Sequence, residues 1–416
     1  FDEQETVPEK TTYYDSAYFD EIYHPRTAWE HIRGIEPYEI SHPPLGKLIM
    51  GVGIRLFGMT PFGWRFMGTL FGVGMLPLLY VFLKNLFGRT SIATCGTVLL
   101  AADFMHLTQT RLATIDTYAF FFILLMYYFM YRYLTLPAGA PFRKCALPLF
   151  LSGLFWGIGA ASKWTVIYGC TGLVVLYFIG LYQKLRDWPA DGERQPGRLK
   201  WAFQILAFSV LVFALIPAAI YTLSYLPYAW AEGDSSLTGL VGAMWENQKY
   251  MLSYHSGVTD THPYSSRWYQ WLFDIRPILY YMDNSVPGYT TRFAAFVNPV
   301  VCWGGLLAVL ACAAQAVRRR CAKALFIVIG YLAQLVPWFF IGRITFAYHY
   351  FPSVLFLILA LCYVFYSLSE QEELIAWKPA MYAITAGAAA LYALFYPVLV
   401  GIQIPSWYGT CLLRWL

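Results

Sequence analysis

Tyr18-Phe19-Asp20-Glu21-Ile22-Tyr23-His24 opens a polar stretch that ends in Ser41-His42-Pro43-Pro44-Leu45-Gly46-Lys47, within a chain that is otherwise very apolar. An adjacent pair of carboxylates and three histidines fall within these residues. The sequence that follows predicts a series of membrane helices. The fold therefore depends on whether those helices hold residues 18–47 and bring other charges to them.

The composition is that of a membrane protein. Of the 416 residues, 58% are hydrophobic and 19% aromatic, and only 13% are charged, whereas soluble domains carry about 25% charged residues. Long apolar runs bordered by Trp and Tyr predict an all-α polytopic membrane protein. The net charge of +5 then reflects the sides that the loops face and indicates no nucleic-acid partner. The eight cysteines are scattered singly, which is typical of small buried side chains.

The apolar runs predict about ten transmembrane helices, or ten to eleven with a helix that we expect to precede Phe1, because an exported N-terminal loop needs one. Residues 45–58 are too short to span and suit an amphipathic helix in the interface. We expect one membrane-embedded domain over residues 1–416, with an outer catalytic loop and interfacial helix (1–61) and an outer lid (224–293). The predicted spans cover residues 62–83, 90–107, 112–131, 146–161, 164–183, 201–223, 294–316, 324–341, 347–368 and 380–404.

The distribution of charge predicts the orientation. If the first loop lies outside and the loops alternate, the inner loops hold fifteen of the 29 basic residues but only six of the 24 acidic ones. Such an excess of Lys and Arg marks the cytoplasmic side. All seven histidines, together with the ionisable residues in or beside the spans, then collect at the outer face. Because charges within membranes are costly and by default functional, we expect a site there.

The Asp20-Glu21 pair is the candidate catalytic group. Adjacent residues in an irregular segment point different ways, so one carboxylate can face a site while the other anchors the loop. A positioned Asp is a suitable base for an acceptor hydroxyl that must lose its proton as it attacks. The alternative is an exposed acidic pair in a loop. Both carboxylates are retained as candidates.

Cations and histidines at outer turns are candidate ligands for a phosphate. His42 and Lys47 flank two prolines that fix the chain direction ahead of the interfacial helix, although Lys47 could instead snorkel to lipid. Arg111 can grip a phosphate by a bidentate fork, and Asp116 could orient it as an ion-pair partner. The alternative for these two residues is a structural pair.

Two further outer turns each place a cation beside aromatic residues. Lys163 lies in Ser162-Lys163-Trp164, and Arg343 begins a segment that reaches His349. Each of them could equally belong to an interfacial aromatic belt. Together, one acidic base and several cations beneath an aromatic lid suit group transfer from a lipid-linked phosphate, whose leaving group needs no general acid.

The sequence resembles the protein O-mannosyltransferase family, which are multi-span glycosyltransferases of the GT-C type. The resemblance covers nearly the whole chain, and the length of the outer loop indicates a prokaryotic member without the β-trefoil insert of the eukaryotic enzymes. It is carried by Phe19–His24, Ser41–Lys47, Phe62-Gly63-Trp64-Arg65, Gln109-Thr110-Arg111 to Asp116, Ser162-Lys163-Trp164, Tyr254-His255-Ser256, and Arg343 to Pro352.

The resemblance implies an inverting transfer of mannose from a polyprenyl (dolichyl-type) phosphate to Ser or Thr of exported proteins, at the non-cytoplasmic face of the cell membrane. By matching position, Asp20 becomes the base, Glu21 its neighbour and Arg111 a charged partner. The expected partners are the lipid donor, the acceptor protein and membrane lipids, with no cofactor.

Three alternatives remain open. A related transferase could use another sugar or a lipid acceptor. A transporter would favour internal repeats and charges near the midplane, neither of which the sequence shows. A metal enzyme would need Glu21, His24, His31 and His42 to cluster, although their spacing matches no standard site.

Overall fold

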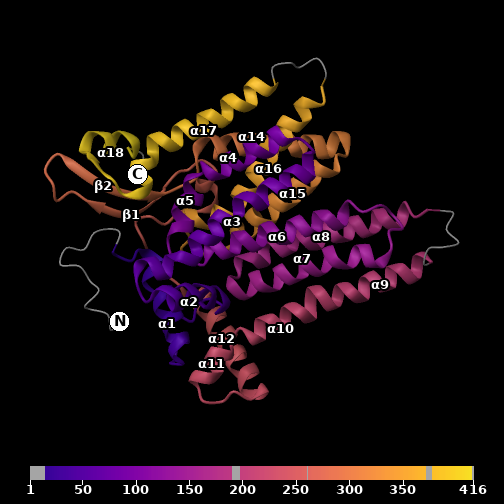
Figure 1. The fold of residues 1–416 in the computed structure, drawn as a ribbon, viewed down its shortest axis with the longest axis horizontal. Coiled ribbons are helices and arrows are strands. Elements are labelled where there is room, and N and C mark those ends of the chain that lie inside the picture. The colour runs from indigo at the N-terminus through magenta and orange to yellow at the C-terminus, as the bar shows by residue number, and fades with distance from the viewer. Residues whose placement is uncertain (1–14, 190–196, 260, 372–376, 415–416) are drawn as a thin grey trace.

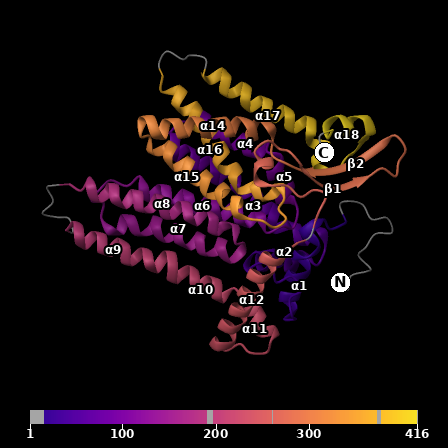
Figure 2. The same ribbon diagram turned by 180° about the vertical axis from the view of Figure 1, so that it is seen from behind.

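The long helices run side by side in one bundle, and short helices and a small sheet gather at one of its ends (Figure 1). The architecture comes from a computed structural model that describes residues 15–189, 197–259, 261–371 and 377–414. Both views place α1, α2, α11, α12 and the strands at this end, while α8 finishes and α9 starts at the other (Figures 1 and 2). The polar stretch and residues 224–293 therefore share one end of the bundle.

The first half of the chain supplies the polar segment and five long helical runs. Its elements are η2 (Phe19–Ile22), α1 (His24–Arg33), α2 (Leu45–Phe57), α3 (Pro61–Phe87), α4 (Thr90–Ala101), α5 (Phe104–Arg111), α6 (Asp116–Leu134), α7 (Phe142–Ser162), α8 (Thr165–Arg186), α9 (Arg198–Val210), η3 (Leu211–Leu215) and α10 (Ile216–Leu223).

The second half supplies the lid elements, the sheet and the last four long helices. Its elements are α11 (Leu226–Ala231), α12 (Leu237–Gly257), α13 (Trp268–Trp271), β1 (Ile278–Asp283), β2 (Tyr289–Ala295), α14 (Pro299–Arg319), α15 (Ala322–Leu335), η4 (Val336–Phe340), η5 (Ala347–Tyr350), α16 (Phe351–Ser369), α17 (Trp377–Val400), β3 (Gln403–Pro405) and α18 (Ser406–Leu412).

Each of the ten spans predicted within the chain coincides with a helix or helix pair, and the eleventh predicted helix would precede Phe1. Among the described residues, eight helices are long and apolar enough to cross a membrane, or nine if the bent pair α4–α5 is one span. The difference is α6, whose five tyrosines and Arg132 lower its hydropathy. Its middle is buried among neighbouring helices, so it needs no lipid-compatible surface.

Local signals explain where α3 begins and where α4 breaks. The Thr60 side chain accepts the Gly63 N–H, and Pro61 occupies the first helical position. Between α4 and α5 the axis turns by 57° at Asp103, which caps α5 through the His106 N–H and also accepts the Asn298 N–H. The bend directs α5 and its C-terminal Arg111 toward the polar end of the bundle.

One turn of π-helix, η3, interrupts the run from α9 to α10. A Cβ added to Gly153 of α7 would lie 2.1 Å from the Val212 carbonyl oxygen, so the two helices touch through backbone. The Trp156 indole N–H donates to the Phe213 carbonyl, 3.1 Å away, within this turn. A π-turn leaves carbonyls that need such partners.

The prediction of an all-α chain overlooked a small antiparallel sheet of order β1-β2-β3. Strand β1 pairs with β2 inside the segment 224–293, and β3, near the C-terminus, pairs Pro405 with Tyr289. Residues 45–58, predicted as an interfacial helix, form α2, which exposes Val52, Leu56 and Phe57. The described parts of the two predicted outer segments thus become compact elements at one end of the bundle.

Candidate active site

A cavity of about 520 Å³ opens at the polar end of the bundle. Its walls come from η2 and α1, from the chain ahead of α2, from the α7–α8 junction, from the end of α12 and from the segment between η4 and η5. Its ionisable lining consists of Asp20, His24, Glu39, His42, Lys163, His255, Arg343 and His349, together with six tyrosines. This size is that of a pocket for a small ligand or a ligand headgroup.

The two adjacent carboxylates of η2 point to opposite sides. Asp20 lines the cavity. Glu21 is 1% exposed, and its oxygens accept Arg65 Nε and Nη2, each at 2.7 Å, and the Ala113 N–H at 2.9 Å. Glu21 therefore ties the segment to α3 and to the loop after α5, and of the two only Asp20 can meet a ligand in this cavity.

The backbone conformation of Phe19 holds the side chains of Asp20 and Glu21 on opposite sides. Phe19 has φ of +54°, a conformation that side chains other than glycine adopt rarely. Its ring packs edge-on against Phe346, His262 and Tyr280, with centroid distances of 4.8, 5.4 and 5.8 Å. These contacts hold a backbone turn that sends the following two side chains in different directions.

The surroundings of Asp20 contain both signs of charge. Burial raises the pKa of Asp20 above its usual value, and the negative charges of Asp116 and Glu39 add to this. His24 and Lys163 act in the opposite direction. The net effect is a raised pKa, which makes the ionised form a better proton acceptor than an exposed carboxylate.

Lys163 stands at the α7–α8 junction and pairs with Asp116 of α6. Its Nζ lies 2.6 Å from Asp116 Oδ1, and both side chains are almost fully buried. The ammonium also lies 5.3 Å from the centroid of the Tyr348 ring. The predicted pair of Arg111 with Asp116 is therefore wrong, because Asp116 is committed to Lys163.

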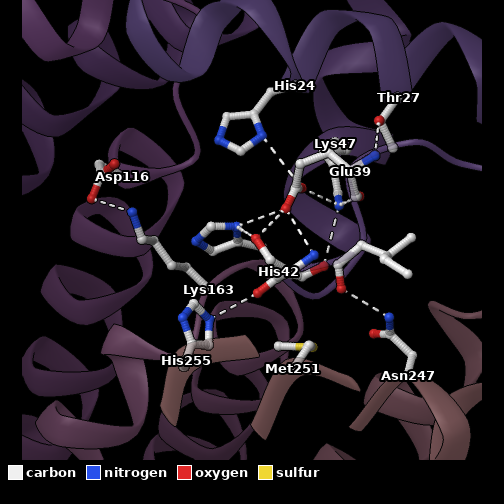
Figure 3. Close-up of polar contacts among 12 residues, drawn as sticks. His24, Thr27, Glu39, His42, Lys47, Asp116, Lys163, Asn247, Met251 and His255 are labelled. Carbon is white, nitrogen blue, oxygen red and sulfur yellow. Dashed lines mark hydrogen bonds and ion pairs between the residues drawn. The ribbon is translucent and has the colours of Figure 1, made fainter. Parts of the chain in front are cut away.

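Glu39, which the sequence analysis did not single out, is the centre of the polar network (Figure 3). Its carboxylate lies 2.7 Å from Lys47 Nζ and 3.1 Å from His42 Nδ1. Burial alone would raise its pKa, yet Lys47 and the two histidines at its oxygens, His24 and His42, hold that pKa well below the usual value. Glu39 is therefore ionised.

Lys47 does not reach the cavity. Its side chain is 0% exposed, and Nζ donates to Glu39 Oε2, to the Glu39 carbonyl and to the His42 carbonyl, at 2.7, 2.7 and 3.2 Å. An ammonium has three N–H donors, and these three acceptors use all of them. The prediction that Lys47 binds a phosphate is thus corrected: it clamps the chain ahead of α2.

Burial keeps two of the histidines at the cavity, His42 and His255, neutral. Burial lowers the pKa of His42 to about 3, and that of His255 to about 4. The buried ring nitrogens of His24 have no hydrogen-bond partner among the described residues, and Nδ1 is 3.6 Å from Glu39. Buried polar atoms in this state are costly, so His24 is arranged to meet a ligand.

Two family models between them match most of the chain from residue 57 onward. The model described as dolichyl-phosphate-mannose-protein mannosyltransferase matches residues 57–231, and that of the C-terminal four-helix membrane region of protein O-mannosyltransferase matches residues 240–416.

The chain belongs to the protein O-mannosyltransferase family.

Relatives with this description include the polyprenol-phosphate-mannose–protein mannosyltransferases of Mycolicibacterium smegmatis and Mycobacterium tuberculosis. Each is 25% identical over 93% of this chain, and the matched region covers 84% and 83% of the respective relative. The yeast dolichyl-phosphate-mannose–protein mannosyltransferase 1 is 26% identical over 50% of this chain and 26% of its own length.

Solved structures establish the fold as GT-C. The Saccharomyces cerevisiae Pmt1-Pmt2 complex bound to the sugar donor superposes with a TM-score of 0.79 at 14% identity, over 94% of this chain and 88% of that one. ArnT from Cupriavidus metallidurans in the apo state gives a TM-score of 0.57 at 16% identity, over 92% and 61% of the two chains. The predicted family and fold class are confirmed.

Within this family member, Arg111 lies outside the cavity. Its guanidinium sits 5.4 Å from the centroid of the Phe293 ring on β2, and Nη1 is 3.4 Å from the Leu399 carbonyl oxygen. Arg111 thus joins the end of α5 to the sheet and to α17. A role in binding the donor would have to be indirect.

Arg343 and His349 do line the cavity. Arg343 donates Nη1 to the Ile344 carbonyl at 3.2 Å and forms no ion pair with a described carboxylate. Nδ1 of the buried His349 lies 3.1 Å from the Phe346 nitrogen and 3.0 Å from the Phe346 carbonyl oxygen, so the backbone of Phe346 holds the ring. Of the nine predicted site residues, five line this cavity, and these are Asp20, His42, Lys163, Arg343 and His349.

The four residues of the metal alternative do not converge. Glu21 faces Arg65, and the His31 ring packs 5.3 Å from Tyr228, centroid to centroid, whereas His24 and His42 lie at Glu39. Among the described residues, no group of three or more His, Cys, Asp or Glu is arranged to hold a metal ion.

One signal could have identified Glu39 from the sequence. Lys47 lies on the apolar helix predicted for residues 45–58, and a buried ammonium needs an anionic partner nearby. Glu39 is the nearest preceding carboxylate in the chain. His255 belongs to a motif that the resemblance already used, but only the structure shows that its Nε2 lies 2.9 Å from the Ser41 carbonyl oxygen.

Proposed function

We propose that the protein transfers mannose from a polyprenyl phosphate to the Ser or Thr hydroxyl of an exported protein, with inversion at the sugar carbon. The observation that carries this proposal is that Asp20 shares one cavity with Lys163 and Arg343. A base for the acceptor and cations for a phosphate are both needed for such a transfer. The mycobacterial relatives are named for this donor and for a protein acceptor.

In the proposed reaction, Asp20 accepts the proton of the acceptor hydroxyl as its oxygen attacks the anomeric carbon. The bond between that carbon and the phosphate oxygen breaks, and the electron pair leaves with the polyprenyl phosphate. Lys163 and Arg343 stabilise the charge that develops on this oxygen, so no general acid is required. Attack from the face opposite the phosphate inverts the carbon.

The remaining lining gives the sugar its hydrogen bonds. His24 Nε2 and His349 Nε2, from two residues that line the cavity, can form hydrogen bonds with hydroxyl groups of a ligand. Aromatic side chains from several elements, including Tyr254 and Trp338, offer faces to a sugar ring. The lipid brings an activated sugar, so we expect the protein to need no cofactor.

The proposed location of the reaction is the non-cytoplasmic face. The end of the bundle that carries the cavity also carries α1, α2, α11 and α12 (Figure 2). The Lys- and Arg-rich loops, such as that after α14 with Arg318, Arg319 and Arg320, belong to the opposite end under the charge rule.

The test is transfer of labelled mannose from polyprenyl-phosphate-mannose to a Thr-containing peptide by purified protein in lipid nanodiscs. We expect glycosylated peptide whose anomeric configuration is opposite to that of the donor. A protein that ignores this donor but uses another polyprenyl-linked sugar would support the related-transferase alternative instead. Retention of configuration would exclude the single-displacement role of Asp20.

A further inference from the structure

A second hollow, of about 650 Å³, adjoins the reaction cavity. Arg267 and Arg276 line it, and Arg343 lines both spaces. The described lining contains no carboxylate; its other polar members are the side chains of Thr259, Thr261, Ser265, Ser266, Gln270 and Thr345. The described lining is therefore cationic, and the hollow connects to the candidate phosphate site through Arg343.

The three guanidinium groups keep most of their donors. Arg267 Nη1 donates to the Gly342 carbonyl at 3.1 Å, and Arg276 Nη1 to the Pro263 carbonyl at 3.3 Å. None of the three arginines forms an ion pair with a described carboxylate, although each guanidinium has five N–H groups. Three adjacent cations repel one another, so this arrangement favours an anionic ligand.

The wall of the hollow is rigid. Ser266 and Thr345 exchange two hydrogen bonds, N–H to carbonyl at 2.8 Å and Oγ1 to carbonyl at 2.6 Å, and both residues are buried. The Trp271 indole N–H donates to Ser266 Oγ at 2.9 Å. Arg276 has φ of +63°, a left-handed conformation that must be held by its surroundings.

Exposed aromatic residues next to the hollow place it at a membrane interface. The Trp268 ring, beside Arg267 in the chain, stacks on Phe339 with centroids 3.8 Å apart. Phe339 is 45% exposed and Phe340 is 82% exposed, in a family member whose helices span the membrane. Cations bordered by exposed aromatic rings suit a lipid that carries a phosphate.

We propose that this hollow binds the lipid product of the transfer, a polyprenyl phosphate monoester, on Arg267 and Arg276. The inference rests on the proposed function. The donor is a phosphodiester with one negative charge, whereas the product monoester ionises again with a pKa of about 6. The additional negative charge of the product favours the hollow, which has more guanidinium groups than the reaction cavity. Arg343 lines both spaces and can contact the phosphate in either.

Product inhibition tests this assignment. Initial rates of transfer in nanodiscs give the donor KM and the inhibition constant Ki of added polyprenyl phosphate, for the wild type, Arg267→Gln and Arg276→Gln. Loss of one charge-assisted contact should raise Ki by about tenfold or more. The donor KM should change by less than about twofold, since neither arginine lines the reaction cavity. Arg292→Gln on β2, outside both spaces, is the matched control and should leave Ki unchanged.

Each other outcome overturns the proposal. An unchanged Ki in both variants removes the product from the hollow, and parallel rises in Ki and KM make the hollow part of the donor site. Phosphatidate, a phospholipid with a phosphate monoester, separates the two sources of this chemistry. If it competes as strongly as polyprenyl phosphate and depends on the same arginines, the hollow is a general lipid-headgroup site.

A binding measurement keeps this proposal distinguishable from the proposed function. The rise in melting temperature caused by polyprenyl phosphate can be recorded without turnover. If the wild-type protein transfers no mannose yet is stabilised through Arg267 and Arg276, the proposed function fails while a lipid-phosphate site remains. If transfer proceeds and polyprenyl phosphate neither stabilises nor inhibits the protein, only the product site is lost.

Discussion

At the scale of the residue, the adjacent carboxylates of η2 have different surroundings. Asp20 faces the cavity with a raised pKa, while Glu21 is enclosed by Arg65 and the Ala113 N–H. The positive φ of Phe19 and its aromatic neighbours hold this arrangement. Substitution of Asp20 should therefore reduce transfer by removing the base, whereas substitution of Glu21 should reduce it by releasing the segment that positions Asp20.

Asp20→Asn is expected to abolish most transfer while leaving donor binding intact. The amide keeps the shape of the carboxylate but cannot accept the hydroxyl proton, and a general base contributes about 10²- to 10⁴-fold. The measurement is the rate of mannose transfer to a peptide, with donor affinity determined separately. Asp283→Asn at the end of β1, which lies outside the cavity, is the control. Near-normal transfer by Asp20→Asn would remove this residue as the base.

The pH dependence of transfer should report the environment of Asp20. Its pKa is raised, so the activity should fall on acidification through a pKa above the ordinary 3.8. In Lys163→Met, the cation that favours the carboxylate is lost and Asp116 is left unpaired, and both changes move this acid limb to higher pH. The profile of kcat/KM against pH measures the limb. An acid limb that stays in place in the variant would separate Lys163 from the base.

At the scale of the element, the Glu39–Lys47 pair fastens the start of α2 to the segment that follows α1 (Figure 3). His42 and Ser41 share the same carboxylate. Asn247 of α12 donates to the Ile40 carbonyl at 2.8 Å, so the lid also holds this segment. The position of the cavity wall thus depends on this charge pair, of which Glu39 lines the cavity and Lys47 does not.

Lys47→Met should lower the free energy of unfolding by about 3–5 kcal/mol, because it leaves the Glu39 carboxylate buried without its main cation. The pKa of Glu39 is depressed in the folded state, so its stabilising contribution is present above its ordinary value of 4.5 and is lost as the pH falls through the folded value. Thermal unfolding in detergent at pH 7 measures the effect.

The double variant Glu39→Gln/Lys47→Met supplies the control, since it removes both charges and should recover part of the lost stability. Equal melting temperatures for the wild type and Lys47→Met would show that the ammonium is dispensable. An additive loss in the double variant would show that the two side chains act independently.

Several elements were predictable from the sequence, and others were not. The apolar runs located every candidate membrane span, and the short amphipathic run at 45–58 predicted α2 almost to the residue, but the 21-residue helix α12 was missed inside the predicted lid. The sheet was overlooked because β3 lies more than a hundred residues beyond its partner β2. Residues 1–14 of the predicted outer loop lie outside the described part of the chain.

Some residues of the site were likewise predictable from the sequence, whereas their partners were not. Lys163 and Arg343 were found because charges at the ends of apolar runs are conspicuous, and Asp20 because it belongs to an adjacent acidic pair in a polar stretch. The partners themselves depend on packing: Asp116 lies near Arg111 in the chain, but in space Lys163 of the α7–α8 junction reaches it. Chain proximity does not reveal which of two nearby cations a buried carboxylate selects.

At the scale of the whole molecule, the excess of Lys and Arg on the cytoplasmic loops and the arrangement of the helices predict the same orientation in the membrane. The described parts of the polar segment and of the lid meet at the same end of the bundle (Figure 1). The Lys184 and Arg186 end of α8 lies at the other. If the rule holds, the entire reaction cavity faces away from the cytoplasm.

Cysteine labelling in intact cells tests this orientation. On a background without the native cysteines, a membrane-impermeant reagent should modify Ser235→Cys, between α11 and α12, and should spare Asp187→Cys, at the end of α8. Both positions are exposed to solvent, so a difference in labelling reports the side of the membrane. The reverse pattern would place the cavity in the cytoplasm and would exclude exported proteins as acceptors.

The lining of the reaction cavity runs from Asp20 to His349, which has a consequence for biosynthesis. Synthesis makes Asp20 before Lys163, His255 and Arg343, and most of the bundle lies between Asp20 and Arg343 in the sequence. Under the proposed function and orientation, Asp20 would therefore cross the membrane before its partners exist, while most of the bundle is still to be inserted. A nascent chain arrested before Arg343 would carry the acidic segment without its complete site, so activity is a late checkpoint on whether insertion has finished.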